Sequence, residues 1–296
     1  MKQVNVLIST YNGEKYISQQ IDSILSQTYS EIKIYVRDDG SEDQTVSLLQ
    51  NYCEKGMIQL LRGTNIGYGP SFLQLLSDAE DGEYWAFCDQ DDVWYPDKIQ
   101  RAVEVLDRMA DDSANMYFHN FVLTDENLDE IGTYRNRIPE YEFSMAITEC
   151  LHMGFATVIN RSFRELMLQG DIEHICTHDW WAELVAMEFG NVYTDDRILA
   201  KHRRLDNSVS EGNLKNKIRW FQKAWKGNAE ISNITTEFQR VFGNVMNHRD
   251  KEILSWFVED KNQVRNSLRK CFYRKRWRSG LVSEVTVRLL MLFGKI

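Results

Sequence analysis

Short apolar segments alternate with helix-forming segments along the first part of this 296-residue chain. The apolar segments are rich in Val, Ile, Leu and aromatic residues, as expected for strands buried on both faces of a parallel sheet. Between them, apolar residues recur at helical spacing, as at Ile17, Ile21 and Leu25. This alternation predicts an α/β fold with a mostly parallel central sheet. The expected strands are 4–8, 32–36, 57–61 and 84–88, with helices near 69–79 and 96–109.

The rest of the chain predicts a second part of the same α/β domain, followed by helices. From about residue 212 onward the pattern is helical. We therefore expect an α/β domain over residues 1–210 and a helical C-terminal region over residues 211–296. Within residues 111–210, the pattern indicates strands at 116–123, 156–159 and 192–193 and a helix at 179–189.

Composition and cysteine usage exclude several classes of protein. Hydrophobic residues make up 43% and charged residues 27%, ordinary values for a globular chain rather than a disordered or collagenous one. No apolar stretch approaches the ~20 residues of a membrane-spanning helix, and the first apolar run is too short for a signal peptide. Five scattered cysteines without a Cys-x-x-Cys pair are typical of reduced thiols and lack zinc-finger spacing. We expect a cytoplasmic protein.

Charge is unevenly distributed along the chain. The formal net charge is −9, yet residues 261–296 carry ten Lys and Arg and one acid, Glu284. Cations alternate with aromatic residues over Lys270–Arg278, and Leu281–Phe293 is largely apolar. A basic amphipathic tail of this kind predicts binding to the anionic inner face of the cell membrane. The alternatives are a solvated basic helix face, or packing on the α/β domain or on a second subunit of a homodimer. The acidic body disfavours nucleic acid as a partner.

Polar clusters follow each of the first four predicted strands. In a parallel sheet the carboxyl ends of the strands meet at one edge, where ligands of α/β proteins bind. The last cluster places three carboxylates within four residues, and these repel one another unless a cation lies among them. Mg²⁺ and Mn²⁺ prefer such oxygen ligands and can bind protein carboxylates and the phosphate oxygens of a substrate at the same time. A plain acidic surface turn is the alternative. The clusters are Ser9–Asn12, Asp38–Ser41, Asn65–Gly67 and Asp89–Asp92.

Other nucleotide and metal chemistries lack their motifs in this chain. There is no G-x-x-x-x-G-K-[ST] phosphate loop and no G-x-S-x-G nucleophile turn. Gly67-Tyr68-Gly69 lacks the third glycine of a dinucleotide-binding fingerprint, because Phe72 occupies that position. His174, Cys176 and His178 do not have the usual zinc-ligand spacing.

Three segments together resemble glycosyltransferase family 2, a family of inverting enzymes with the GT-A fold. They are Val6–Gly13, Arg37–Thr45 and Asp89–Lys98, in that order and at the family's spacing. The third segment begins Asp-Gln-Asp-Asp-Val-Trp, and this form of the motif is most similar to that of the bacterial rhamnosyltransferase branch. The resemblance implies a nucleotide-sugar-binding half over residues 1–110 and an acceptor half over residues 111–210.

The resemblance also implies roles for individual residues on the donor side. Asp39 matches the acid that hydrogen-bonds the pyrimidine base. Asp89 and Asp91 match the ends of the D-x-D motif, and Asp91 is the expected main ligand of Mn²⁺ or Mg²⁺. His202 is a further candidate metal ligand, with a structural histidine as the alternative. The expected nucleotide-binding residues are Ser9, Thr10, Tyr11, Asp39, Asn65, Gly67, Asp89 and Arg204.

On the acceptor side, Asp179 matches the family's catalytic base, with a simple helix N-cap as the alternative. Gly154 matches the glycine of the acceptor loop, although the branch often has Cys where this chain has Phe155. Trp180 and Trp181 are expected to stack on sugar faces, unless one of them is a core aromatic residue.

The implied function is transfer of a sugar from dTDP-L-rhamnose or a UDP-hexose. The acceptor would be a hydroxyl of a growing cell-surface polysaccharide or a glycolipid at the membrane. A non-catalytic carbohydrate- or nucleotide-binding module on the same scaffold is the rival hypothesis. A sugar-1-phosphate nucleotidyltransferase would need a glycine-rich loop after the first strand, and residues 9–13 do not form one.

Overall fold

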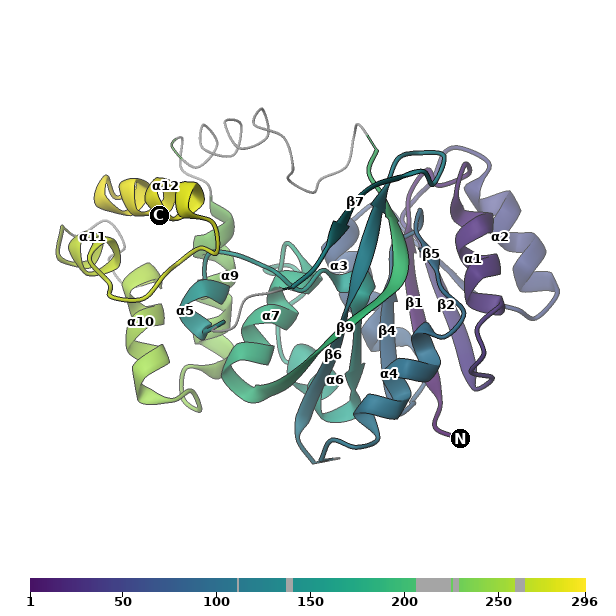
Figure 1. Ribbon diagram of the computed structural model, residues 1–296, viewed down its shortest axis with the longest axis horizontal. Coiled ribbons are helices and arrows are strands. Elements are labelled where there is room, and N and C mark those ends of the chain that lie inside the picture. The colour runs from purple at the N-terminus through teal and green to yellow at the C-terminus, as the bar shows by residue number, and fades with distance from the viewer. Residues whose placement is uncertain (111, 137–140, 206–224, 226–228, 259–263) are drawn as a thin grey trace.

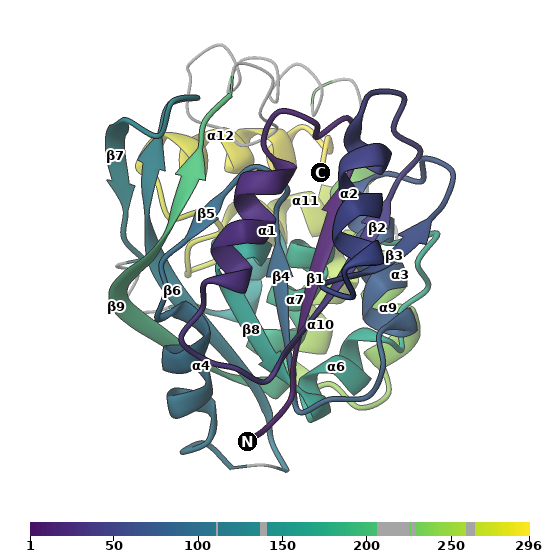
Figure 2. The same ribbon diagram turned by 90° about the vertical axis from the view of Figure 1, so that its right-hand side faces the viewer.

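A single sheet of nine strands runs through the molecule, with helices on both of its faces (Figures 1 and 2). The computed structural model describes residues 1–110, 112–136, 141–205, 225, 229–258 and 264–296. The strand order is β3-β2-β1-β4-β8-β6-β9-β5, with β7 paired to β6. The strands are β1 (Val4–Thr10), β2 (Ile32–Asp38), β3 (Gln59–Arg62), β4 (Tyr84–Cys88), β5 (Val93–Trp94), β6 (Ala114–Thr124), β7 (Glu130–Tyr134), β8 (Thr157–Asn160) and β9 (Gly190–Arg203).

Alternate residues of the buried strands face two separate hydrophobic clusters. Val4, Val6 and Ile8 of β1 pack with helices on one face of the sheet, while Leu7 packs on the other. The first face carries α1 (Ile17–Leu25), α2 (Thr45–Glu54) and α4 (Lys98–Leu106), and the second carries α3 (Tyr68–Asp78), α6 (Arg161–Met167) and α7 (His178–Phe189). The predicted α/β fold is confirmed.

Parallel pairing dominates the first half of the sheet and antiparallel pairing the second. β3, β2, β1 and β4 are all parallel, as the run of apolar segments predicts. Beyond β4, only β6 and β9 pair in parallel, whereas β8, β5 and β7 join antiparallel to their neighbours. The last long strand also differs from its prediction: β9 spans Gly190–Arg203 rather than 192–193 alone. Its first half is mostly exposed and polar, so it lacks the apolar run that marks a buried strand.

The C-terminal region is helical where the structure describes it, as predicted. It contains α9 (Ala229–Phe242), α10 (His248–Val258), α11 (Val264–Cys271) and α12 (Leu281–Leu292), which gather at the end of the molecule opposite α1 and α2 (Figure 1). Among the described residues, none of the helices is both long and apolar enough to cross a bilayer.

The basic tail packs on the α/β domain through one of its sides. Trp277 is fully buried in the same hydrophobic cluster as Trp181 of α7. The Thr148 hydroxyl donates to the Trp277 carbonyl at 2.5 Å, and Lys275 pairs with Glu142, which precedes α5 (Phe143–Ala146). The tail therefore contributes to the core of the protein, and only its outer side is exposed.

Candidate active site

A pocket of about 600 Å³ opens at the carboxyl ends of the strands. The polar clusters after β1, β2, β3 and β4 all contribute to it, as the parallel arrangement predicts. The beginning of α7, the loop before β8 and the end of β9 complete the wall. The lining residues are Ser9, Tyr11, Asp39, Asn65, Gly67, Tyr68, Phe72, Asp89, Gln90, Asp91, Met153, Gly154, Phe155, His178, Asp179, His202, Arg203 and Leu205.

Asp39 lies in the pocket wall at the end of β2, held by donors from the protein itself. Its side chain pairs with Arg37. Its carboxylate also accepts the backbone N–H groups of Ile66 at 3.1 Å and Gly67 at 2.9 Å. Gly67 has φ of 88°, a conformation that favours glycine, and this turn directs both N–H groups at Asp39. A carboxylate offers about four acceptor sites, so it retains capacity for one more donor.

Gln90 joins the end of β1 to the acidic turn after β4. Its side-chain oxygen accepts the Thr10 hydroxyl at 2.7 Å and the Tyr11 backbone N–H at 3.0 Å. Thr10 is therefore buried behind the wall, although it is a predicted nucleotide-binding residue. Ser9 lines the pocket and donates its hydroxyl proton to Ser71 of α3 at 2.7 Å.

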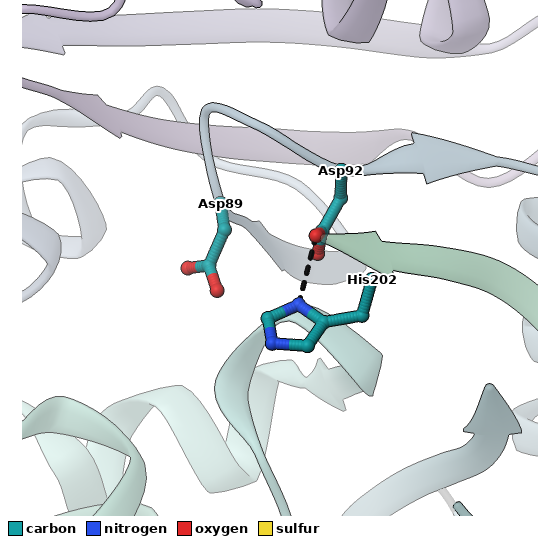
Figure 3. A group of neighbouring side chains, drawn as sticks. All are labelled: Asp89, Asp92 and His202. Atoms are coloured by element: carbon teal, nitrogen blue, oxygen red, sulfur yellow. Dashed lines mark hydrogen bonds and ion pairs between the residues drawn. The ribbon is translucent and has the colours of Figure 1, made fainter. Parts of the chain in front are cut away.

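The acidic turn and the end of β9 form a cluster of possible metal ligands (Figure 3). Asp89, Asp92 and His202 each contribute one ligand atom, all within 4.8 Å of one another. The sequence predicts Asp89, Asp91 and His202 for this role. The structure instead brings Asp92 into this cluster, because Asp92 Oδ1 lies 2.8 Å from His202 Nδ1. Asp91 lines the pocket beside it.

Burial and mutual repulsion perturb these groups strongly. Burial, then the charges of Asp92 and Asp91, raise the pKa of Asp89 well above its ordinary value. The same causes, burial and Asp92, raise the pKa of Asp91 to about 6. Burial opposes the charged form of His202, but Asp92 outweighs it and raises the pKa to about 9. Asp92 Oδ2 is buried without a hydrogen-bond partner among the described residues. A hard divalent cation fits this set, since it would relieve the carboxylate repulsion.

Asp179 lines the same pocket as the acidic turn and lies in the first turn of α7. The N-cap of this helix is Thr177, so Asp179 is not the N-cap residue. Its carboxylate accepts the Trp180 backbone N–H at 2.9 Å. Burial raises the pKa of Asp179 to about 6. A carboxyl with this pKa is ionised at neutral pH, while still basic enough to take a proton.

The loop with Gly154 is fastened to both α4 and β9. Lys98 is fully buried, and its ammonium donates to the Phe155 carbonyl at 2.6 Å. The Phe155 ring stacks on His202 with centroids 4.4 Å apart. Phe155, where the branch often has Cys, thus supports the imidazole. The role of Lys98 is not predictable from its place at the end of the Asp89–Lys98 motif, because a buried lysine leaves no local signal.

Besides Thr10, three predicted residues lie away from the pocket lining. Trp181 is fully buried, and its indole N–H donates to the Met167 carbonyl at 3.0 Å, so the structure makes it a core residue. The Trp180 indole N–H donates to the Ala146 carbonyl at 2.7 Å. At the end of β9 it is Arg203, not Arg204, that lines the pocket, and its guanidinium donates to the Asp91 carbonyl at 2.5 Å. β9 ends at Arg203, and Arg204 follows it outside the strand.

Comparison with known proteins identifies related sequences. Residues 5–169, more than half of the chain, match the sequence profile of glycosyl transferase family 2. The dTDP-rhamnosyl transferase RfbG of Shigella flexneri is 28% identical over 227 residues, covering 72% of this chain and 76% of that protein. An uncharacterized glycosyltransferase of Rickettsia typhi, RT0329, is 26% identical over 229 residues, covering 76% and 70%.

Solved structures show the same fold. TarS residues 1–349 of S. aureus, in complex with UDP, superpose with a TM-score of 0.59 at 17% identity, covering 90% of this chain and 75% of that one. The mannosyltransferase PcManGT of Pyrobaculum calidifontis, in complex with GDP-Man and Mn²⁺, gives 0.57 at 15% identity, covering 99% and 86%. This likeness supports the GT-A fold implied by the sequence motifs.

Proposed function

Because the chain belongs to glycosyl transferase family 2, we propose that it is an inverting glycosyltransferase. The donor would be dTDP-L-rhamnose or a UDP-hexose, and the acceptor a hydroxyl of a growing cell-surface polysaccharide or a glycolipid. One observation carries the proposal: the acids Asp89 and Asp91, after the end of β4, and Asp179, at the start of α7, line the same pocket. The 28% identity to a dTDP-rhamnosyl transferase supports dTDP-L-rhamnose as the first donor to test.

The acidic wall suits a nucleoside diphosphate held through Mn²⁺ or Mg²⁺. Asp89, Asp91 and Nε2 of His202 would hold the ion, and Asp92, which the structure groups with Asp89 and His202, would orient the imidazole through Nδ1. When bound, such an ion stabilises the negative charge that develops on the leaving diphosphate. Asp39 and the neighbouring Ser9 and Tyr11 would bind the nucleoside, with Asp39 accepting a base N–H. The Arg203 guanidinium fixes the acidic turn through the Asp91 carbonyl.

Asp179 would act as the general base in a single displacement. The acceptor hydroxyl oxygen attacks the anomeric carbon, its proton passes to the Asp179 carboxylate, and the bond from that carbon to the diphosphate oxygen breaks. Attack from the face opposite the leaving group inverts the anomeric configuration. Asp179 and the acidic turn belong to different elements but line one pocket, so a base and a diphosphate site are available to the same pair of substrates.

A turnover assay with defined donors tests the proposal. We expect nucleoside diphosphate release from dTDP-L-rhamnose or a UDP-hexose with Mn²⁺ or Mg²⁺, stimulated by a saccharide acceptor, and a product of inverted configuration by NMR. Binding of the donor without any release would instead support the non-catalytic module. A product that retains the donor's anomeric configuration would refute the single displacement.

We also propose that the outer side of the tail binds an anionic membrane surface, where lipid-linked acceptors lie. Exposed apolar side chains recur every four residues at Val264 and Leu268 of α11 and at Phe272, the residue after this helix. A second exposed row lies on α12, at Leu281, Val285 and Leu289. Exposed cations at 274–276 lie in the segment between the two helices. Apolar rows flanked by cations are the features of helices that lie in the membrane interface.

Surface substitutions test this membrane proposal better than truncation, because truncation would remove Trp277 and other core residues. We expect the full chain to sediment with anionic liposomes, with salt weakening the binding as it screens the charges. The combined variant Leu281→Ser, Val285→Ser and Leu289→Ser should show less of the liposome binding that persists at high salt, without a lower thermal stability. Full-length protein that ignores anionic liposomes at low salt would refute the proposal.

A further inference from the structure

His178 is a buried imidazole in the pocket wall whose two ring nitrogens have no hydrogen-bond partner among the described residues. It is 3% exposed, opens α7, and lines the same pocket as Asp179. Buried polar atoms are almost always hydrogen-bonded, because leaving one unpaired costs about 1–3 kcal/mol. Neither Nδ1 nor Nε2 of His178 has a hydrogen-bond partner in the part of the chain that the structure describes. A buried side chain that faces a ligand pocket with this unused capacity indicates that the ligand supplies the partner.

An aromatic cage holds the imidazole in place without using its nitrogens. The rings of Phe72 and Phe87 lie 4.1 Å and 4.9 Å from it, centroid to centroid, and Tyr68 approaches edge-on at 6.3 Å. Phe72 belongs to α3, and Phe87 belongs to β4, the strand that leads into Asp89. The cage therefore packs His178 against the strand that leads into the acidic turn.

Two glycines leave the room that this arrangement needs. A Cβ on Gly154 would lie 2.2 Å from His178 Nε2, so only glycine there leaves space beside that nitrogen. A Cβ on Gly69 would lie 2.3 Å from the Cys176 carbonyl oxygen, so Gly69 lets α3 approach the start of α7 closely. Gly67-Tyr68-Gly69 is not a dinucleotide fingerprint, and the packing of α3 on α7 explains its second glycine.

We infer that His178 binds a hydroxyl of the transferred sugar and thereby contributes to the selection of the donor sugar. The inference rests on the proposed function, since it requires a nucleotide sugar in this pocket. A neutral imidazole carries one donor and one acceptor nitrogen, the same pair of roles that a hydroxyl offers. The sugar of the donor follows directly from its diphosphate, and Asp89 and Asp91 lie next to the cage.

The charge state of the ring favours a sugar over a phosphate group. Burial lowers the pKa of His178 to about 3, so the imidazole is uncharged at neutral pH. A neutral ring offers a phosphate no ionic attraction and only one N–H, whereas both nitrogens can serve hydroxyls. Arg203 and a bound cation would serve the diphosphate instead.

Calorimetry on His178→Phe, with dTDP and dTDP-L-rhamnose each in the presence of Mn²⁺, tests the inference. Phe fits an aromatic cage and removes both nitrogens. We expect the affinity for dTDP to stay within about twofold of the unaltered protein, and that for dTDP-L-rhamnose to fall roughly 2–12-fold, the worth of one hydrogen bond. His178→Gln, which keeps a donor and an acceptor, should recover part of the loss. His174→Phe, at an exposed imidazole four residues earlier, should change neither affinity. If the unaltered protein binds dTDP but not dTDP-L-rhamnose, the same calorimetry is done with UDP and UDP-glucose.

Each alternative result has a distinct meaning. Equal losses for dTDP and for the sugar nucleotide would make His178 a structural residue and overturn the inference. Unchanged affinity for both ligands would overturn it as well, while leaving the proposed function intact. If the unaltered protein binds no nucleotide, the proposed function fails first. Should His178→Phe not fold, imidazole ¹⁵N spectra of the unaltered protein decide: a His178 shift with the sugar nucleotide, and none with the nucleoside diphosphate alone, supports the inference, and its absence overturns it.

Discussion

The two walls of the pocket differ in how their polar groups are satisfied. On the donor wall, at the ends of β1, β2 and β4, the protein supplies partners for two side chains: Asp39 binds Arg37 and two backbone N–H groups, and Gln90 binds Thr10 and Tyr11. Asp92 Oδ2, in the acidic turn, is the exception that a cation would satisfy. On the α7 wall, formed by the start of α7 with His178 and Asp179, both nitrogens of His178 have no partner among the described residues.

This difference suggests that the two walls have different roles: the donor wall holds a fixed geometry, and the α7 wall discriminates between sugars. Internal hydrogen bonds hold the donor wall in one geometry before any ligand arrives, which reduces the ordering that binding requires. The nucleoside diphosphate is common to many donors, so a fixed wall suits it. The α7 wall keeps unused hydrogen-bonding capacity at His178, next to Asp179, where the proposed sugar hydroxyl would bind. Substitutions on the two walls should therefore fail in different ways.

The largest expected effect is loss of cation-dependent binding in Asp91→Ala on the donor wall. Substitution of residues that only orient metal ligands costs 10–100-fold in metal affinity, so we expect a loss of at least about 100-fold for nucleoside diphosphate with Mn²⁺. Calorimetry measures this. Asp97→Ala, at an exposed acid of the same motif, should bind normally. Wild-type affinity in Asp91→Ala would remove Asp91 from the metal site.

Asp179→Asn should distinguish the roles of the two walls most clearly, because it is expected to affect transfer but not donor binding. We expect donor affinity to remain and the transfer rate to fall roughly 10²–10⁴-fold, the usual contribution of a general base. Transfer kinetics and donor calorimetry on the same preparation test both parts. Glu173→Gln, at an exposed acid that precedes α7, is the control and should transfer at the normal rate. Turnover near that of the unaltered protein would show that Asp179 is not the base.

The fall of the transfer rate at acidic pH should follow the protonation of Asp179, on the α7 wall. Because burial raises the pKa of Asp179 to about 6, the carboxylate protonates on acidification well before an ordinary Asp. A base works only when ionised, so transfer at saturating donor should fall about tenfold between pH 7 and pH 5. His178→Phe should keep this fall in rate. A profile that stays flat down to pH 5 would argue against a raised pKa at the base.

The smallest expected effect is on stability, at the contact between α3 and α7. In Gly69→Ala the new methyl group meets backbone atoms of Cys176 and Thr177 that cannot move independently. We expect the free energy of unfolding to fall by about 1–3 kcal/mol, the usual cost of overpacking, as measured by denaturant titration. Gly132→Ala in β7 meets only a Leu123 side chain at 3.6 Å and should cost less than ~0.5 kcal/mol. Equal stability of the two variants would contradict the close packing.

Much of the donor wall could be predicted from the sequence, because each of its parts is encoded locally. Buried parallel strands leave continuous apolar runs, and the polar residues that follow them meet at one sheet edge. Ser9, Asp39 and Asp89 could thus be assigned to one site from the order of strands and motifs alone. The helices after residue 228 were equally predictable from their periodicity. The length of β9 was not, since its exposed half has no apolar run.

The tertiary structure decided the contacts between segments that lie far apart in the chain. Asp92 meets His202 only because β9 ends beside the acidic turn, and that depends on how β9 pairs with β5 and β6. The same packing buries Trp181 and leaves His178 in the pocket, although they are three residues apart on one helix. A sequence pattern shows that a helix has an apolar face, but not which neighbour will cover it. Local periodicity therefore determined the elements and the donor wall, whereas the packing of distant segments determined which side chains kept their hydrogen-bonding groups free for a ligand.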